Sequence, residues 1–129
     1  MLYKRHEYFR HSFGTPLEAT FRILVEGSTN ESNPGKCLLL DISPGGSKII
    51  SSFDLPVEGM SGSIHLKLEF TLFETPIDID GKIAWKKHTV DGFQYGIDFV
   101  EDPSVAKLIV DELKLRRRTE IGPTDGKKS

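Results

Sequence analysis

The chain has 129 residues, 37% of them hydrophobic and 28% charged, which suits one globular domain rather than two domains or a disordered chain. Its formal net charge of -2 argues against a protein that coats nucleic acid, because such proteins need a broadly basic face. The basic start lacks the apolar core of a signal peptide, and no later apolar run reaches membrane-spanning length. We therefore expect a cytoplasmic protein without membrane insertion.

The segment KRHEYFR, residues 4–10, combines four cationic or potentially cationic side chains with two aromatic rings and one glutamate. A β-rich chain of net negative charge has no general need for such a segment. We expect residues 1–16 to form a flexible N-terminal arm, and we expect this arm to hold a small anionic or aromatic ligand.

Apolar residues then recur with a period of two or in short runs, as in strands with a buried face. Six segments follow this pattern: residues 17–25, 37–43, 47–52, 64–70, 77–85 and 93–99. Cys37 is expected to be a buried small hydrophobic residue rather than a redox group. Trp85 is expected in the core, because its neighbours two residues away are apolar. A tight turn after Pro44 joins two strands, with Gly45 and Gly46 free to adopt positive φ.

After the last of these segments the period becomes that of a helix. Asp102 suits the N-cap and Pro103 the first helical position. One face is apolar through Val105, Leu108, Ile109 and Leu113. We expect the arginines at 116–118 in the last turn, where cations complement the helix dipole, and a disordered tail over residues 119–129.

Short antiparallel strands followed by one helix predict a small closed or nearly closed barrel, with the helix packed against it. We expect this barrel and its helix to span residues 17–118.

A second polar element, DISPGG, occupies residues 41–46. Asp41 and Ser43 are two residues apart and therefore point to the same side of a strand, and Gly46 lets a ligand or another chain approach the backbone. Taken alone, these residue types predict only a β-turn.

Together, the arm and this turn resemble the signature of the PilZ domain family, bacterial receptors for the second messenger cyclic di-GMP. That signature is an RxxxR segment, often preceded by another arginine, followed a few tens of residues later by D/N-x-S-x-x-G. DISPGG fits the second motif, and GKIAW and FQYGIDF look like the family's last barrel strands. The resemblance covers roughly residues 4–115 and implies an all-β fold, a six-stranded antiparallel barrel with a C-terminal α-helix.

The first motif departs from the family pattern. Aligned on Arg10, the segment RHEYFR places Arg5 at the preceding arginine and His6 at the first arginine of RxxxR, so this chain reads HxxxR. Arginine can donate two parallel bonds to a phosphate or to a guanine edge, whereas a largely neutral histidine donates one. Each lost charge-assisted bond costs roughly 1.5–3 kcal/mol, on the order of 10- to 100-fold in affinity.

The resemblance implies a cyclic di-GMP site between the arm and the turn, with no cofactor besides this ligand. Its residues are Arg5, His6, Arg10, Asp41, Ser43 and Gly46. The arginines would grip phosphate or guanine edges, and the histidine would stack or donate. Asp41 would accept hydrogen bonds from guanine N–H groups, and Ser43 would add a hydroxyl bond. Gly46 would keep the turn low enough for the base to lie against its backbone. Binding would order the arm across the barrel, and this movement would be the output.

Three other classes of protein stay open at this point. The first is a degenerate PilZ-like adaptor that binds a protein partner, which the departure at His6 supports. The second is an oligonucleotide-binding barrel with Tyr8, Phe9 and Phe13 as stacking rings, although the low positive charge argues against nucleic acid. The third is an enzyme. The sequence shows no paired nucleophile and base and no cysteine metal cluster, so we expect no catalysis. Its histidines lie on separate segments, at His6, His11, His65 and His88.

Overall fold

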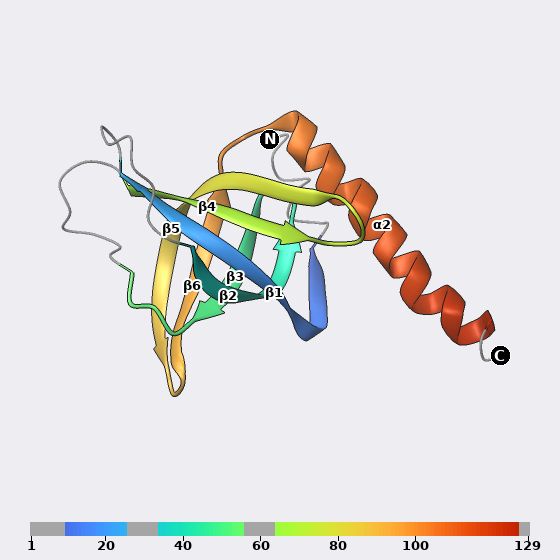
Figure 1. Ribbon diagram of the computed structural model, residues 1–129, viewed down its shortest axis with the longest axis horizontal. Coiled ribbons are helices and arrows are strands. Elements are labelled where there is room, and N and C mark those ends of the chain that lie inside the picture. The colour runs from blue at the N-terminus through green and yellow to red at the C-terminus, as the bar shows by residue number, and fades with distance from the viewer. Residues whose placement is uncertain (1–9, 26–33, 56–63, 127–129) are drawn as a thin grey trace.

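The computed structural model describes residues 10–25, 34–55 and 64–126. Its elements are β1 (His11–Val25), β2 (Gly35–Ser43), β3 (Gly46–Ser51), β4 (Ile64–Thr71), β5 (Pro76–Thr89), β6 (Gly92–Phe99) and α2 (Pro103–Gly126). The strands close into an antiparallel barrel in the order β1-β2-β3-β6-β5-β4, and α2 lies on its outside (Figure 1). The predicted six-stranded barrel with a C-terminal helix is thereby confirmed.

The barrel interior is filled by apolar side chains, because alternate residues of each strand point inward. Fully buried members include Leu39, Ile42, Ile49, Leu68 and Tyr95. The Tyr95 hydroxyl accepts from Leu55 N at 2.8 Å and donates to Phe53 O at 2.6 Å, so its polar end is satisfied. Cys37 is also buried, as predicted, and burial raises the pKa of its thiol to about 12. A ligand must therefore bind outside this packed interior.

The first strand begins at His11, whereas we expected the barrel to begin at Leu17. Phe13 is buried in the core, and its ring lies 5.0 Å from the guanidinium carbon of Arg116 on α2. The β1–β2 register shifts between Ser12 and Leu17, where β1 has extra residues. This irregular stretch interrupts the alternation, which is why the sequence pattern missed the start of the strand. Residues 11–16 of the predicted arm therefore belong to the barrel.

Helix α2 begins as predicted but ends later. The Asp102 carboxylate accepts from the backbone N–H groups of Ser104 and Val105, at 3.1 and 3.2 Å, which confirms it as the N-cap. The helix continues to Gly126, so the disordered tail expected from residue 119 is wrong over 119–126, and 127–129 lie outside the described residues. Thr119 Oγ1 donates to the Leu115 carbonyl at 2.9 Å, which satisfies this hydroxyl within the helix.

The arginines at 116–118 consequently precede the last turn of α2, contrary to expectation. Arg116 instead helps to dock the helix, since its Nη1 donates to Leu72 O at 2.8 Å. One turn earlier, Glu112 accepts from the backbone N–H groups of the β4–β5 turn. The C-terminal part of α2 extends past the strands (Figure 1). Among the residues that the structure describes, no helix is both long and apolar enough to cross a membrane.

Candidate functional site

Two β-bulges turn Asp41 and Trp85 to the outside of the barrel. In the β2–β3 pair, Leu39 opposes Ile49 but Asp41 opposes Lys48, so β2 has one extra residue. In the β5–β6 pair, β5 gains one residue in the same way between Ile83 and Trp85. Because side chains alternate along a strand, each extra residue reverses the face on which the next residues of that strand lie. Without the bulges, both side chains would point into the core.

The registers place outward-facing residues of four strands in two neighbouring rows. Directly opposed residues of antiparallel strands share a face. The first row, across β2, β3, β6 and β5, is Asp41, Lys48, Gly96 and Trp85. The second row is Ser43, Gly46, Asp98 and Lys82. The barrel thus presents a polar patch with an aromatic ring at one end.

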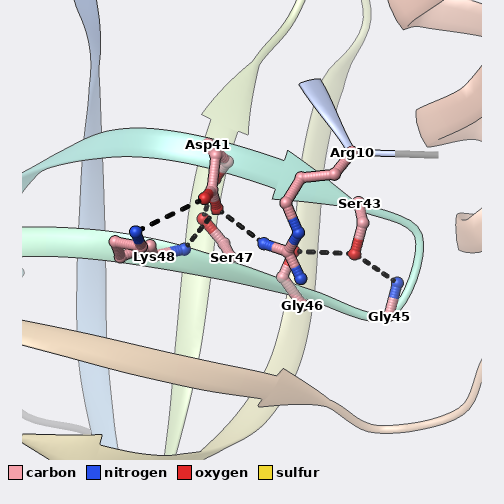
Figure 2. Close-up of polar contacts among 7 residues, drawn as sticks. All are labelled: Arg10, Asp41, Ser43, Gly45, Gly46, Ser47 and Lys48. Atoms are coloured by element: carbon pink, nitrogen blue, oxygen red, sulfur yellow. Dashed lines mark hydrogen bonds and ion pairs between the residues drawn. The ribbon is translucent and has the colours of Figure 1, made fainter. Parts of the chain in front are cut away.

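Arg10 connects the N-terminal segment to this patch. Its Nη1 donates to Asp41 Oδ1 at 2.9 Å, and the same oxygen accepts from Lys48 N at 3.0 Å. The Lys48 ammonium lies 4.0 Å from the other carboxylate oxygen. Figure 2 shows the Arg10 side chain reaching over the β2–β3 hairpin between Asp41 and Ser43. Two segments distant in sequence therefore meet at one carboxylate.

The β2–β3 turn is held by its own side chains. Ser43 Oγ accepts from Gly45 N at 3.3 Å and donates to Gly46 O at 3.4 Å, both long hydrogen bonds. Ser47 Oγ donates to the Asp41 carbonyl at 2.7 Å (Figure 2). The turn thus presents Ser43 beside Asp41, as the two-residue spacing predicted.

The two glycines of this turn do not adopt positive φ, contrary to expectation; Gly92 is the only glycine with positive φ within the described ranges. Gly46 has a different reason to lack a side chain. A Cβ there would lie 2.5 Å from the Ile97 carbonyl oxygen, because β3 and β6 approach closely at this point. The small size of Gly46 is therefore a packing requirement.

A cavity of about 770 Å³ extends over the patch. Its lining includes four of the six predicted site residues, Arg10, Asp41, Ser43 and Gly46. Arg5 and His6 lie outside the described residues. The cavity continues over β5 and β6 to the start of α2, where Trp85, Asp98 and Ala106 line it.

Trp85 is the residue that sequence reasoning misplaced. We expected it in the core, but it is 41% exposed, because the bulge before it points the indole outward. The indole lies against Gly96, where a Cβ would collide with its Nε1. A signal was available, since a glycine inside a strand often marks the close approach of another group.

A larger hollow, of about 980 Å³, is lined by residues of β1 to β5 and contains none of the predicted site residues. Its rim carries Glu18, Glu69 and Asp78, with Lys36 as its one cation among the described residues. An anionic ligand would be repelled there, so we assign the candidate site to the smaller cavity.

The smaller cavity lies outside a filled barrel and joins guanidinium, carboxylate and hydroxyl groups to an aromatic face. These groups suit noncovalent binding of a polar ring compound. The PilZ domain model matches residues 4–115, and the chain belongs to the PilZ domain family, whose members are ligand-binding receptor domains. No curated protein matches the chain.

Solved structures agree in fold. The PilZ domain of YcgR from Escherichia coli with c-di-GMP has a TM-score of 0.60 at 17% identity, over 92% of this chain and 95% of that one. Bacillus subtilis MotI/DgrA, an inhibitor of motility, has a TM-score of 0.55 at 14% identity, over 83% of this chain and 51% of that one. The PilZ domain of CeSA from a cellulose-synthesizing bacterium has a TM-score of 0.50 at 12% identity, over 85% and 98%. This chain therefore spans about half of the MotI/DgrA chain.

Proposed function

We propose that this chain is a bacterial receptor module for cyclic di-GMP, which it binds between the N-terminal arm and the DISPGG turn. The observation that carries the proposal is the contact between Arg10 and Asp41, which unites the two halves of the family signature at one cavity. Membership of the PilZ family and the likeness to a PilZ domain with c-di-GMP support it.

The chemistry of the site suits a guanine nucleotide. A carboxylate such as Asp41 accepts two N–H bonds from guanine, whose N1 and 2-amino groups are donors. The Arg10 guanidinium can donate a pair of bonds to a phosphate or to O6 and N7 of guanine. Arg5 and His6 would add further contacts from the arm. The volume of the cavity falls within the roughly 300–1,000 Å³ typical of small-molecule sites.

Trp85 extends the proposed site beyond the signature residues. Its indole is exposed, lines the same cavity and lies in the same row as Asp41. Stacking of a base on an aromatic ring is worth about 1–3 kcal/mol per base. We assign Trp85 the role of a platform for one guanine of the ligand.

The proposed output is a conformational change that starts at Arg10. This residue immediately precedes β1, and Phe13 three residues later packs beneath Arg116 of α2. A ligand that moved Arg10 away from Asp41 would displace the start of β1. That displacement would reach α2 through Phe13.

Calorimetric titration with cyclic di-GMP tests the proposal. Cyclic di-AMP is the matched control, because it keeps both phosphates but lacks the N1–H and 2-amino donors that Asp41 would recognise. We expect saturable binding of cyclic di-GMP and at least tenfold weaker binding of cyclic di-AMP. Equal affinity for the two nucleotides would remove guanine recognition from the proposal.

A second candidate function is an adaptor that keeps the barrel and binds a protein partner without the nucleotide. The histidine at position 6 favours it, because the arm then lacks one arginine of RxxxR. Failure of the natural chain to bind cyclic di-GMP at high concentration, with binding created by His6→Arg, would favour this adaptor.

A further inference from the structure

The cavity is short of positive charge for a ligand that carries two phosphodiester groups. Within the described part of the chain, Arg10 and Lys48 are the only cations in its lining. Four carboxylates also line it, from Asp41, Asp98, Glu101 and Asp102. With a histidine in place of an arginine at position 6, the arm cannot fully correct this balance. A bound cyclic dinucleotide therefore needs a cation in this lining besides Arg10.

Lys48 is placed to be that cation. It lies on β3 directly between Asp41 of β2 and Gly96 of β6, in the row that ends at Trp85. Strands are spaced about 4.8 Å apart, so Lys48 stands about 5 Å from the Asp41 backbone and about 10 Å from that of Trp85. A nucleotide with guanines on these two residues must pass its phosphates over the Lys48 position.

The Lys48 backbone is fixed while its ammonium group is loosely held. The backbone N donates to Asp41 Oδ1 at 3.0 Å, which anchors the residue to β2. The ammonium lies 4.0 Å from Asp41 Oδ2, which is too long for a hydrogen bond, and the side chain is 43% exposed. Turning this group toward a phosphate therefore breaks no short contact to Asp41.

We propose that Lys48 binds a phosphate of the cyclic dinucleotide and supplies the positive charge that His6 does not. This inference rests on the proposed function. Lysine suits the role because it binds phosphate as a point charge and needs no fixed bidentate geometry. Lys48 is thus a ligand-binding residue outside both signature motifs.

Calorimetric titration of cyclic di-GMP into the full chain tests the inference. Lys48→Met removes the charge and keeps most of the aliphatic stem, and Lys48→Gln is a second variant of the same kind. The matched control is Lys36→Met, which removes an exposed lysine from β2 at the rim of the other hollow. We expect about tenfold weaker binding for the Lys48 variants and less than a twofold change for Lys36→Met. Lys48→Arg keeps the charge and should bind within about threefold of the natural chain.

A double-mutant cycle with His6→Arg distinguishes a phosphate contact from a structural effect through Asp41. If Lys48 compensates for His6, then Lys48→Met should cost about tenfold in the natural chain but only about threefold beside His6→Arg. If Lys48→Met weakened binding equally in the natural chain and beside His6→Arg, Lys48 would not compensate for His6. If the natural chain bound cyclic di-GMP and Lys48→Met bound it with the same affinity, the inference would be overturned and the proposed function would stand. Absence of binding by the natural chain and by His6→Arg would overturn both.

Discussion

Arg10 Nη1 lies 2.9 Å from Asp41 Oδ1, which joins the residue before β1 to the carboxylate near the end of β2. The Arg10 side chain is 44% exposed, so this ion pair contributes little to stability, about 0–1 kcal/mol. Its main effect is on position, because it holds a guanidinium over the cavity beside Ser43 (Figure 2). The pair therefore connects the cavity to the start of the barrel.

Arg10→Ala should abolish most cyclic di-GMP binding and leave the fold intact. It removes a charge-assisted contact worth roughly 1.5–3 kcal/mol, so we expect the Kd to rise at least tenfold in calorimetry. The midpoint of thermal unfolding should shift by only a few degrees, because the Arg10 side chain is largely exposed to solvent. Asp41→Ala is the companion variant, and it should remove discrimination between guanine and adenine. Unchanged affinity in Arg10→Ala would show that the barrel holds the ligand by itself.

His6→Arg should tighten cyclic di-GMP binding by about tenfold or more. The change restores a permanent charge and a bidentate donor at the position where the family has an arginine. His65→Arg is the control, since it adds the same side chain on β4, away from the residues that line the cavity. If both variants gained equally, the gain would reflect overall charge and not position 6.

The parts of the fold that depend on local sequence were predictable. Alternating apolar residues predicted the strands, Asp102 predicted the start of α2, and the six residues from Asp41 to Gly46 predicted the polar turn. Each of these signals lies within a few neighbouring residues. They depend on period and on turn chemistry, which the chain carries locally.

The face on which Trp85 lies could not be predicted from its neighbours along the chain, because the glycine that signals a close approach, Gly96, lies on a different strand. A bulge depends on how two strands pair. The extra residues, Leu40 and Ala84, are neither glycine nor proline, so their types do not mark a bulge. The start of β1 was missed for a related reason, because Gly14 and Pro16 interrupt the alternation where the strand has extra residues. Pairing between distant strands thus determined the part of the site that local patterns missed.

Removing residues 1–9 should preserve a cooperatively folded barrel, because β1 begins at His11 and its buried Phe13 is retained. Cyclic di-GMP binding should fall, since Arg5 and His6 are lost. Removing residues 1–13 should also reduce stability, and Phe13→Ala should cost about 3–5 kcal/mol in urea unfolding. Circular dichroism and calorimetry on the two truncations check this. If the chain that lacks residues 1–9 bound cyclic di-GMP as tightly as the whole chain, those residues would be excluded from the site.

Trp85 is the single tryptophan of the chain, so its fluorescence reports directly on the cavity. We expect cyclic di-GMP to change the Trp85 emission as a guanine stacks on the indole. Trp85→Ala should weaken binding by about 10-fold or more, whereas Trp85→Phe should retain part of the affinity. Gly96→Ala should act similarly, because the added methyl group displaces the indole without entering the core. Saturable binding in calorimetry with unchanged emission would refute the stacking role.

Glu112 should make the docking of α2 depend on pH. Its carboxylate accepts from Phe73 N and Glu74 N at 2.9 Å and from Thr75 N at 3.1 Å, and the residue is buried. Burial acts to raise its pKa, but the bonds from the backbone N–H groups outweigh burial, and the pKa of Glu112 is lowered. Folding therefore favours the ionised carboxylate. This stabilisation is fully present above the unfolded pKa of about 4.3 and is lost as the pH falls through the lower folded value.

Glu112→Gln tests this dependence, because the amide keeps the shape and one acceptor but cannot ionise. At pH 7 we expect the free energy of unfolding in urea to fall by about 2 kcal/mol, the cost of losing charge-assisted bonds from three partly buried backbone N–H groups. Near pH 3 the natural carboxyl is increasingly protonated, so the difference between the two proteins should shrink. Glu18→Gln, on the exposed face of β1, is the control and should change stability little at either pH. A difference for Glu112→Gln that stayed equally large at pH 3 would attribute the loss to packing of the amide and not to the charge that holds α2 on the β4–β5 turn.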